Sequence, residues 1–373
     1  MQSSTMPPPR PMDAPSILIS GPAVSAADPA AGDPASARVL GLSRRKRRYL
    51  AAFLPATRLR PTRDASGAAP GEALIVWASS AAASSLESRP DQPLLRIEDG
   101  FLRSVGLGAQ LTRPLSWVVD SRGIYYDPCR PSDLEHLLST TIFTPSLLGR
   151  AARLRERIVA HDISKYNVGD TDWQELSPAA ATRPVVLVAG QVEADASLRA
   201  GAGPARSNAA LIAAARAAHP DGWLVYKPHP DVVAGLRRAG RDEHDATRLC
   251  DEVVTAAPIS RLIERASAVH VMTSLTGFEA LLRGKQVHCH GLPFYAGWGL
   301  TFDTVRAERR GRRLTLDELV AAALILYPRY VSLRTGRPCA VEQTLDELID
   351  WRARDNGAPR WWQRLLKPVL RRD

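Results

Sequence analysis

Cysteine is scarce in this sequence, with four residues in a chain of 373. Cys129, Cys250, Cys289 and Cys339 lie far apart and form no CxxC pair. Paired cysteines are typical of disulfide-stapled domains and of structural zinc sites, so this spacing argues against both.

Cys289 has a histidine on either side, His288 and His290. On an extended strand the two histidines point to one face and the cysteine points to the other. We therefore interpret this segment as a polar strand end beside a cleft, and we expect no metal site.

The sequence also lacks any run of the roughly 20 apolar residues that a membrane-spanning helix needs. Its first residues, MQSSTMPPPRPMDAPS, have neither the basic lead nor the apolar core of a secretory signal. These two absences predict a cytoplasmic protein. Residues 1–40 are rich in proline, alanine and serine, which predicts a disordered leader. Neither GxxxxGK[ST] nor GxGxxG is present, which argues against a P-loop NTPase and a dinucleotide oxidoreductase.

Basic charge, in contrast, is abundant, because 49 lysines and arginines against 39 acidic residues give a net charge of +10. Such a surface favours polyanions, namely nucleic acid, acidic lipid headgroups or anionic metabolites. Basic residues cluster at 44–48, at 309–313 and in the last segment, PRWWQRLLKPVLRRD. A basic cluster alone is usually a solvated face. No RNA- or DNA-binding motif accompanies these clusters, so no nucleic-acid partner is expected.

The length and the alternation of apolar segments predict an α/β protein with two Rossmann-like domains, at residues 41–175 and 176–345. The second half alternates short apolar runs with helical segments, which predicts a parallel, doubly wound sheet. The strands expected there are 185–188, 223–227, 268–272 and 286–289, and the helices are 207–218, 259–267, 275–283 and 314–330. Residues 346–373 should form a last helix followed by a basic and aromatic tail.

The stretch VVLVAGQVEADAS, residues 185–197, is the first candidate reaction centre. Its valines predict a buried strand, and Gln191, Glu193 and Asp195 follow directly. In open α/β sheets, ligands bind where strands end at their carboxyl edge. Packing explains two carboxylates poorly at that edge, so we predict Asp195 as a nucleophile.

Two further strands end in residues suited to a phosphate. YKPHPD places Lys227 and His229 two residues apart on a proline-stiffened segment. MTSLTGFEALLRGK places Thr273 and Ser274 at a helix N-terminus, which is a natural phosphate site, and Glu279 one turn further on. An ordinary helix cap would explain the hydroxyls alone, but together with His229 a phosphate site is favoured.

Two loops leave their role open. EDGFLRSVGLG, with Glu98, Asp99 and Arg103, suits a substrate loop from the facing domain but equally a tight structural turn. GLPFYAGWGLT, residues 291–301, sets aromatics between glycines, as in a sugar site or a domain hinge.

The chemistry-bearing motifs occur in a fixed order over roughly residues 73–345. They are EDGFLRS, LSWVVDSRGIYYD, RPSDLE, SKYN, GQVEADAS, YKPHPD, MTSLTGFEALLRGK, GLPFYAGWGLT and LILYPRY. This series resembles the capsular polysaccharide biosynthesis β-Kdo transferases, where Kdo is 3-deoxy-D-manno-oct-2-ulosonic acid. It is most similar to the second transferase module of the tandem member of that family.

The resemblance implies a GT-B-like fold of two facing Rossmann-type domains, with the acceptor on the first and the CMP-β-Kdo donor on the second. It also implies retention of configuration without a metal or other cofactor. Asp195 would be the nucleophile, His229 with Lys227 would stabilise the CMP phosphate, and Glu98 would face the acceptor. The remaining predicted substrate-binding residues are Gln191, Glu193, Ser274, Glu279, Thr273, Asp99 and Arg103.

The resemblance further implies a Kdo-bearing acceptor on a phosphatidylglycerol-type lipid, and hence a protein peripheral to the inner membrane. The tail RWWQRLLKPVLRR would then meet anionic lipid, and other capsule biosynthesis proteins are candidate partners. Only one module is present in this sequence, so a separate partner supplies the other linkage or the product differs. A noncatalytic capsule assembly partner and an inverting transferase, with Asp195 as a base, stay open as alternatives.

Overall fold

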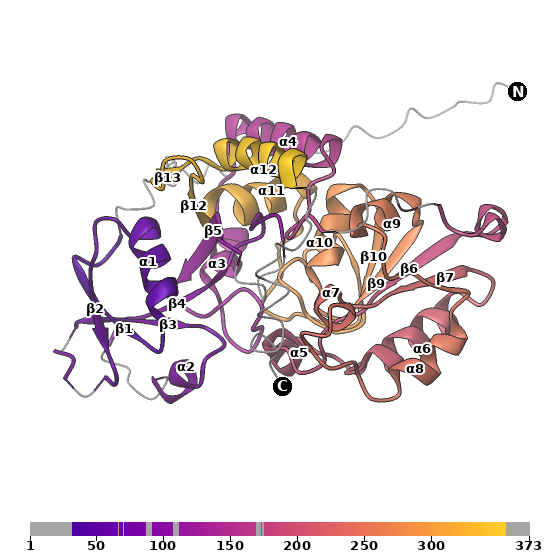
Figure 1. The fold of residues 1–373 in the computed structure, drawn as a ribbon, viewed down its shortest axis with the longest axis horizontal. Coiled ribbons are helices and arrows are strands. Elements are labelled where there is room, and N and C mark those ends of the chain that lie inside the picture. Colours follow the sequence, from indigo (N-terminus) through magenta and orange to yellow (C-terminus); the bar gives the residue numbers. More distant parts are fainter. Residues whose placement is uncertain are drawn as a thin grey trace, which may run out of the picture.

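The structure, a computed structural model, describes residues 32–65, 67–69, 71–86, 92–106, 112–168, 173 and 175–355. Over these residues the chain forms two α/β halves, each built on one sheet, that face one another (Figure 1). The predicted fold class, α/β with two facing Rossmann-type domains, is confirmed.

The first sheet has seven strands and is mixed. In spatial order they are β13 (Pro338–Cys339), β12 (Pro328–Val331), β5 (Ser116–Asp120), β4 (Leu94–Asp99), β3 (Ala73–Trp77), β1 (Ser36–Leu40) and β2 (Arg58–Thr62). Strands β2, β1, β3 and β4 run parallel, whereas β5, β12 and β13 pair antiparallel with their neighbours. The expectation of a parallel sheet therefore holds in this half only for β1 to β4.

Two segments of this sheet correct the sequence-based expectations. Strand β1 falls within the predicted leader, residues 1–40, because Ala37 and Val39 alternate with more polar residues and are buried between β2 and β3. Residues 328–330 were expected to end the helix 314–330 but belong to β12. Pro328 has no backbone N–H to continue a helix, so the chain extends and pairs with β5.

The second sheet is entirely parallel, as predicted. In spatial order its strands are β11 (Phe302–Asp303), β10 (Gln286–Cys289), β9 (Ala268–Val271), β6 (Val185–Ala189), β7 (Trp223–Lys227) and β8 (Glu252–Val253). Sequence runs outward from β6 on both sides, so the switch point of this sheet lies between β6 and β9. Ligands bind at such switch points.

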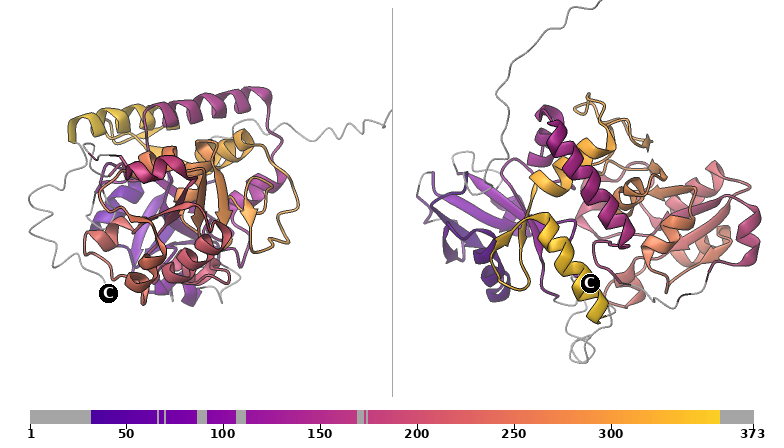
Figure 2. Two further views of the ribbon diagram at one scale, coloured as in Figure 1. Left: turned by 90° about the vertical axis from the view of Figure 1, so that its right-hand side faces the viewer. Right: turned by 90° about the horizontal axis from the view of Figure 1, so that it is seen from above.

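Helices cover both sheets and also bridge the two halves. In sequence order they are α1 (Arg44–Phe53), α2 (Ala81–Leu86), α3 (Asp133–Thr140), α4 (Pro145–Ala160), α5 (Ala196–Gly201), α6 (Asn208–Ala218), α7 (Pro230–Val233), α8 (Glu243–Ala246), α9 (Ile259–Arg265), α10 (Leu275–Leu282), α11 (Leu316–Val320) and α12 (Val341–Asp355). A π-helical segment, Ala321–Leu326, continues α11. Helices α4, α11 and α12 lie across the top of the molecule (Figures 1 and 2), and Arg150 of α4 pairs with Glu342 of α12 at 2.7 Å. None of the described helices has the length and apolar character needed to cross a lipid bilayer.

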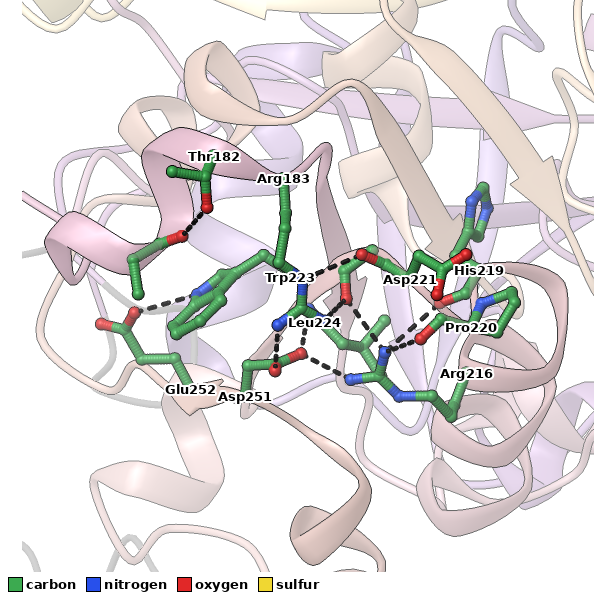
Figure 3. Close-up of polar contacts among 12 residues, drawn as sticks. Thr182, Arg183, Arg216, His219, Pro220, Asp221, Trp223, Leu224, Asp251 and Glu252 are labelled. Carbon is green, nitrogen blue, oxygen red and sulfur yellow. Dashed lines mark hydrogen bonds and ion pairs between the residues drawn. The ribbon is translucent and has the colours of Figure 1, made fainter.

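The second sheet is fastened at the amino ends of its strands, far from its carboxyl edge. There, Arg183 and Arg216 converge on the Asp251 carboxylate, at 3.0 and 2.5 Å (Figure 3). Asp251 also accepts the Leu224 backbone N–H of β7 at 2.8 Å. This clamp fixes the position of β7, whose other end carries Lys227.

One apolar cluster runs through both halves. Phe101, which follows β4, stacks on Phe294 with ring centroids 4.7 Å apart and meets Phe278 of α10 at 6.1 Å. Phe294 belongs to the glycine-rich loop 291–301, and Tyr295 and Trp298 of that loop are fully buried. The loop 291–301 therefore joins the halves through its aromatic side chains.

Candidate active site

A cleft of about 940 Å³ lies between the two halves, at the carboxyl ends of β4, β6, β7 and β9. It brings together ten of the eleven site residues predicted from the sequence. They are Glu98, Asp99, Arg103, Gln191, Asp195, Lys227, His229, Thr273, Ser274 and Glu279. The cleft thus combines the loops after four strands that are far apart in the chain.

Glu193 is the exception, because its side chain turns away from the cleft. Its carboxylate accepts the Asn208 backbone N–H at the start of α6, at 2.8 Å. It also packs so tightly against Gly240 that a Cβ there would lie 2.1 Å from Glu193 Oε1. The chain turns between the two residues, since Asp195 N–H donates to Val192 C=O, so Glu193 stabilises a helix start whereas Asp195 faces the cleft.

Asp195 stands at the switch point of the second sheet. A turn closed by Asp195 N–H to Val192 C=O, at 2.9 Å, follows β6 and makes Asp195 the N-cap of α5. Asp195 Oδ1 accepts the Ser197 backbone N–H at 2.9 Å, and the side chain is exposed. The described residues provide no hydrogen bond to Oδ2. The carboxylate is held in one orientation with one oxygen open to the cleft.

Gln191 and Thr273 join the loops that follow β6 and β9 at the switch point. Gln191 Nε2 donates to Thr273 Oγ1 at 3.0 Å, and Gln191 Oε1 accepts the Thr273 backbone N–H at 2.8 Å. Thr273 Oγ1 donates in turn to Ser197 Oγ at 3.3 Å. With both ends of its amide paired, Gln191 positions the two loops, and its role in substrate binding stays a prediction.

His229 and Lys227 line the side of the cleft beyond β7. His229 Nδ1 accepts the Asp231 backbone N–H at 3.1 Å, which leaves the ring proton of a neutral imidazole on Nε2. Burial lowers the pKa of His229, which favours this neutral form. Burial also lowers the pKa of Lys227 to about 8, and its Nζ donates to Thr255 C=O. The cleft wall therefore offers a neutral hydrogen-bond donor, His229, and an amine, Lys227, that titrates close to neutral pH.

The N-terminus of α10 forms the third wall. Ser274 is its N-cap, and Ser274 Oγ accepts the Thr276 backbone N–H at 3.2 Å. Tyr295 fixes the cap from behind by donating its hydroxyl to Ser274 C=O. One turn on, Glu279 Oε1 accepts the Lys165 backbone N–H at 2.8 Å, and burial raises the pKa of Glu279. Unpaired N–H groups at such a terminus attract anions.

Glu98 and Asp99 face these walls from the first half. Burial, and then the charge of Asp99, raise the pKa of Glu98 to about 8. Asp99 forms an ion pair with Arg103, whose Nε lies 2.7 Å from Oδ2, and it accepts the Trp117 indole N–H at 3.0 Å. Asp99 and Arg103 therefore build the turn that presents Glu98, so this loop is both a structural turn and a cleft wall.

Comparison with known proteins identifies the family. A family model described as capsule polysaccharide biosynthesis protein matches residues 72–330. The chain belongs to this family. It is 46% identical over 257 residues to the capsule polysaccharide modification protein LipA of Neisseria meningitidis serogroup A, covering 69% of this chain and 36% of LipA. It is 42% identical over 294 residues to the lipopolysaccharide-processing protein LpsZ of Rhizobium meliloti, covering 78% of this chain and 66% of LpsZ. This capsule-family chain therefore spans little more than a third of the length of LipA.

Two solved structures share the fold of this capsule-family protein. The KpsC beta Kdo 2,4 transferase of Thermosulfurimonas dismutans has a TM-score of 0.73 at 36% identity, covering 84% of this chain and 98% of that one. The KpsC beta Kdo 2,7 transferase of the same organism has a TM-score of 0.70 at 35% identity, covering 85% and 99%. The motif resemblance to capsule Kdo transferases and the GT-B-like fold are confirmed.

The structure also places in the cleft residues that the sequence-based prediction missed. Lys165 lies between the halves, and its backbone carbonyl accepts the N–H groups of Arg103 and Ser104 at 3.3 Å. Burial opposes the charge of Lys165, but Tyr125, Tyr166 and nearby acids hold its pKa above the usual range. The sequence feature that could have indicated Lys165 is the tetrapeptide SKYN, residues 164–167. It stands out only as one member of the ordered series of motifs typical of the capsule family.

Proposed function

We propose that this protein is a retaining β-Kdo transferase that moves Kdo from CMP-β-Kdo to a Kdo-bearing acceptor in capsule polysaccharide biosynthesis and export. The observation that carries the proposal is the Asp195 carboxylate at the β6–β9 switch point, in one cleft with Lys227, His229 and the α10 N-terminus. Similarity to proteins named as Kdo transferases supports it.

In the first step, an oxygen of Asp195 attacks C2 of Kdo, the anomeric carbon, and forms a C–O bond. The bond between C2 and the phosphate oxygen breaks, and its electron pair leaves with CMP. His229 Nε2–H, protonated Lys227 and the N–H groups at α10 would stabilise the charge on that phosphate. These groups supply the positive potential that the leaving group needs, so no metal or other cofactor is proposed for the transfer.

In the second step, an acceptor hydroxyl attacks C2 and the bond to Asp195 breaks, which restores the carboxylate. Two displacements at the same carbon retain its configuration. The hydroxyl proton passes to the ionised form of Glu98, a group whose pKa of about 8 is suited to proton transfer near neutral pH.

The acceptor would lie against the first half of the chain. Lys46, Tyr49 and Trp77 line that wall, with Lys46 Nζ 3.1 Å from the centroid of the Trp77 ring. The Lys46 ammonium group, held over the Trp77 ring, would attract the carboxylate of an acidic sugar. The tail proposed to meet anionic inner-membrane lipid, residues 359–373, lies outside the described residues. Unchanged flotation with phosphatidylglycerol vesicles after its deletion would remove that part of the proposal.

Mass spectrometry of the intact protein tests the mechanism. After incubation with freshly generated CMP-Kdo and no acceptor, the wild type should gain one Kdo mass. Asp195→Asn should not, although asparagine is an equally good N-cap for α5. Glu193→Gln is the matched control, because Glu193 faces away from the cleft, and it should retain the adduct.

The outcomes separate the alternatives. Transfer to acceptor without any adduct would leave the donor in place but replace double displacement by an inverting mechanism. Neither adduct nor transfer with any Kdo acceptor tried would favour a noncatalytic partner in capsule assembly.

A further inference from the structure

Four histidines gather on one face of the second sheet, away from the cleft. His270 lies in β9 and His288 in the neighbouring β10, where the two are register partners. His219 caps the C-terminus of α6, and His290 directly follows β10. None of the four lines the cleft. The proposed transfer reaction uses none of them.

Their ring nitrogens converge. His219 Nε2 lies 3.0 Å from His270 Nε2, and His270 Nδ1 lies 3.0 Å from His290 Nε2. The His288 ring stacks on His270 with centroids 4.5 Å apart. One ligand atom from each of His219, His270 and His288 lies within 4.8 Å of the other two.

Hydrogen bonding among the imidazoles leaves one buried ring nitrogen, that of His288, without a partner. A neutral histidine has one N–H, so His219 can donate to His270 and His270 can donate to His290, and both short contacts are satisfied. His288 Nε2 is buried and has no hydrogen-bond partner among the residues that the structure describes. Buried polar atoms are nearly always paired, so this nitrogen indicates that the cluster binds something further.

The surroundings hold the rings in place. His288 is sandwiched between His270 and Phe302, whose ring centroid lies 4.8 Å away. The backbone carbonyl of His219 accepts from Arg216 Nη1 at 3.3 Å, so the end of α6 is tied into the clamp of Figure 3. The fold itself therefore holds these rings close together.

We propose that His219, His270 and His288 bind one divalent transition-metal ion of the zinc class. Three imidazoles select Zn²⁺, Co²⁺, Ni²⁺ or Cu²⁺ over Mg²⁺ and Ca²⁺, which prefer oxygen. The His219 proton moves from Nε2 to Nδ1, and the ion takes its place between His219 and His270 and gives His288 Nε2 its missing partner. His270 Nδ1–H then donates to His290, the outer hydrogen bond that typically orients a metal-bound histidine.

Partial exposure of two of the three ligands favours occupancy. The side chains of His219 and His288 are only partly buried, so an ion can approach the cluster from their side.

The ion would tie α6 to β9 and β10, the strands that lead into Thr273 and the loop of Phe294 at the cleft. Its role is therefore structural support of the nucleotide-binding half, apart from the transfer chemistry.

The test is metal binding by the untagged full chain, since a histidine tag would bind the same ions. Co²⁺ titration should give visible absorption bands of a low-coordinate site at one equivalent, and Zn²⁺ should displace them. Zn²⁺ should also raise the unfolding temperature of the wild type. The variants are His288→Gln and His219→Gln, and the control is His136→Gln, an exposed histidine on α3.

Losing an outer hydrogen bond to a metal ligand weakens binding by about 10- to 100-fold, so losing a ligand should weaken Co²⁺ binding by at least about 100-fold. His290→Gln should fall between the ligand variants and the control. Similar metal-free circular dichroism in all variants would show that they fold. Absence of Co²⁺ or Zn²⁺ binding by the wild type, or equal binding by His288→Gln and wild type, would overturn the proposal.

Discussion

Two ionisable side chains in the cleft have pKa values displaced in opposite directions, and both end near 8. Burial and the charge of Asp99 raise the pKa of Glu98, whereas burial lowers the pKa of Lys227. A carboxyl and an amine brought to the same range are suited to exchanging protons and charge at neutral pH. The raised pKa of Glu98 should make the stability of the protein depend on pH, and the lowered pKa of Lys227 should make its affinity for CMP depend on pH.

Glu98→Gln should flatten the pH dependence of stability. Because the folded pKa of Glu98 lies above its unfolded value of 4.5, the unfolded chain loses this proton first as the pH rises. The contribution of Glu98 to stability is therefore full below pH 4.5 and is lost up to about pH 8, by at most about 1.4 kcal/mol per pH unit. Denaturant unfolding of both proteins from pH 4.5 to 8 measures the difference, and parallel curves would contradict the assignment.

Lys227→Met should remove a pH-dependent part of CMP binding. Lys227 carries its charge below about pH 8, so the affinity of the wild type for CMP should fall above that pH, by up to about tenfold per unit. The variant should bind weakly, with little change between pH 7 and 9, as measured by calorimetry. Lys285→Met, whose native amine donates to Glu264 C=O outside the cleft, should behave as wild type.

Single residues also show where sequence-based prediction succeeds. Asp195 and His229 were predicted at a ligand site because they directly follow strands at the carboxyl edge of the sheet, and both line the cleft. The direction of Glu193 was not predictable, since it depends on Gly240, which lies far along the chain. Lys165 was missed because its environment comes from both halves, and no local pattern encodes that meeting.

At the scale of elements, Asp120 at the end of β5 organises the joint between the first sheet and the α11 region. It is fully buried and accepts the backbone N–H groups of Gly123 and Asp133, at 2.8 and 3.0 Å. Tyr327, which follows the π-helical segment, donates its hydroxyl to Asp120 Oδ2 at 2.8 Å. This bond holds the chain at the point where helix gives way to β12.

Tyr327→Phe should cost about 1.5–3 kcal/mol, the range for a lost hydrogen bond to a charged group. Tyr330→Phe is the matched variant, because Tyr330 is equally buried but donates to a neutral carbonyl, that of Leu324, at 2.7 Å. It should cost about 0.5–1.5 kcal/mol. Chemical denaturation of both variants decides the point, and equal losses would argue against a special role for Asp120.

Element boundaries were predictable wherever short-range chemistry sets them. Strands β7 and β10 begin and end as predicted, and Thr315 caps α11 with Glu318 in a capping box. The change from helix to strand at Pro328 was missed, because the apolar run before it fits a helix throughout. Its end depends on pairing with β5, which lies two hundred residues earlier in the chain.

At the scale of the whole molecule, the shared apolar cluster predicts that the two halves unfold together. Phe101 belongs to the first half, but its ring contacts Phe278 and Phe294 of the second as well as Tyr125 of its own. Loss of those contacts destabilises both sheets at once. Cooperative unfolding of the wild type should therefore appear as one calorimetric transition.

Phe101→Ala should lower the free energy of unfolding by about 3–5 kcal/mol, the usual cost of truncating a buried phenylalanine. The single transition should move to lower temperature without splitting, because the cavity lies in the joint. Ile75→Ala is the comparison, since Ile75 packs in a cluster confined to the first sheet, α1 and β12. If the halves were independent, either variant would leave one transition in place and shift another. If they unfold as one unit, both variants shift the whole curve, and scanning calorimetry distinguishes the two.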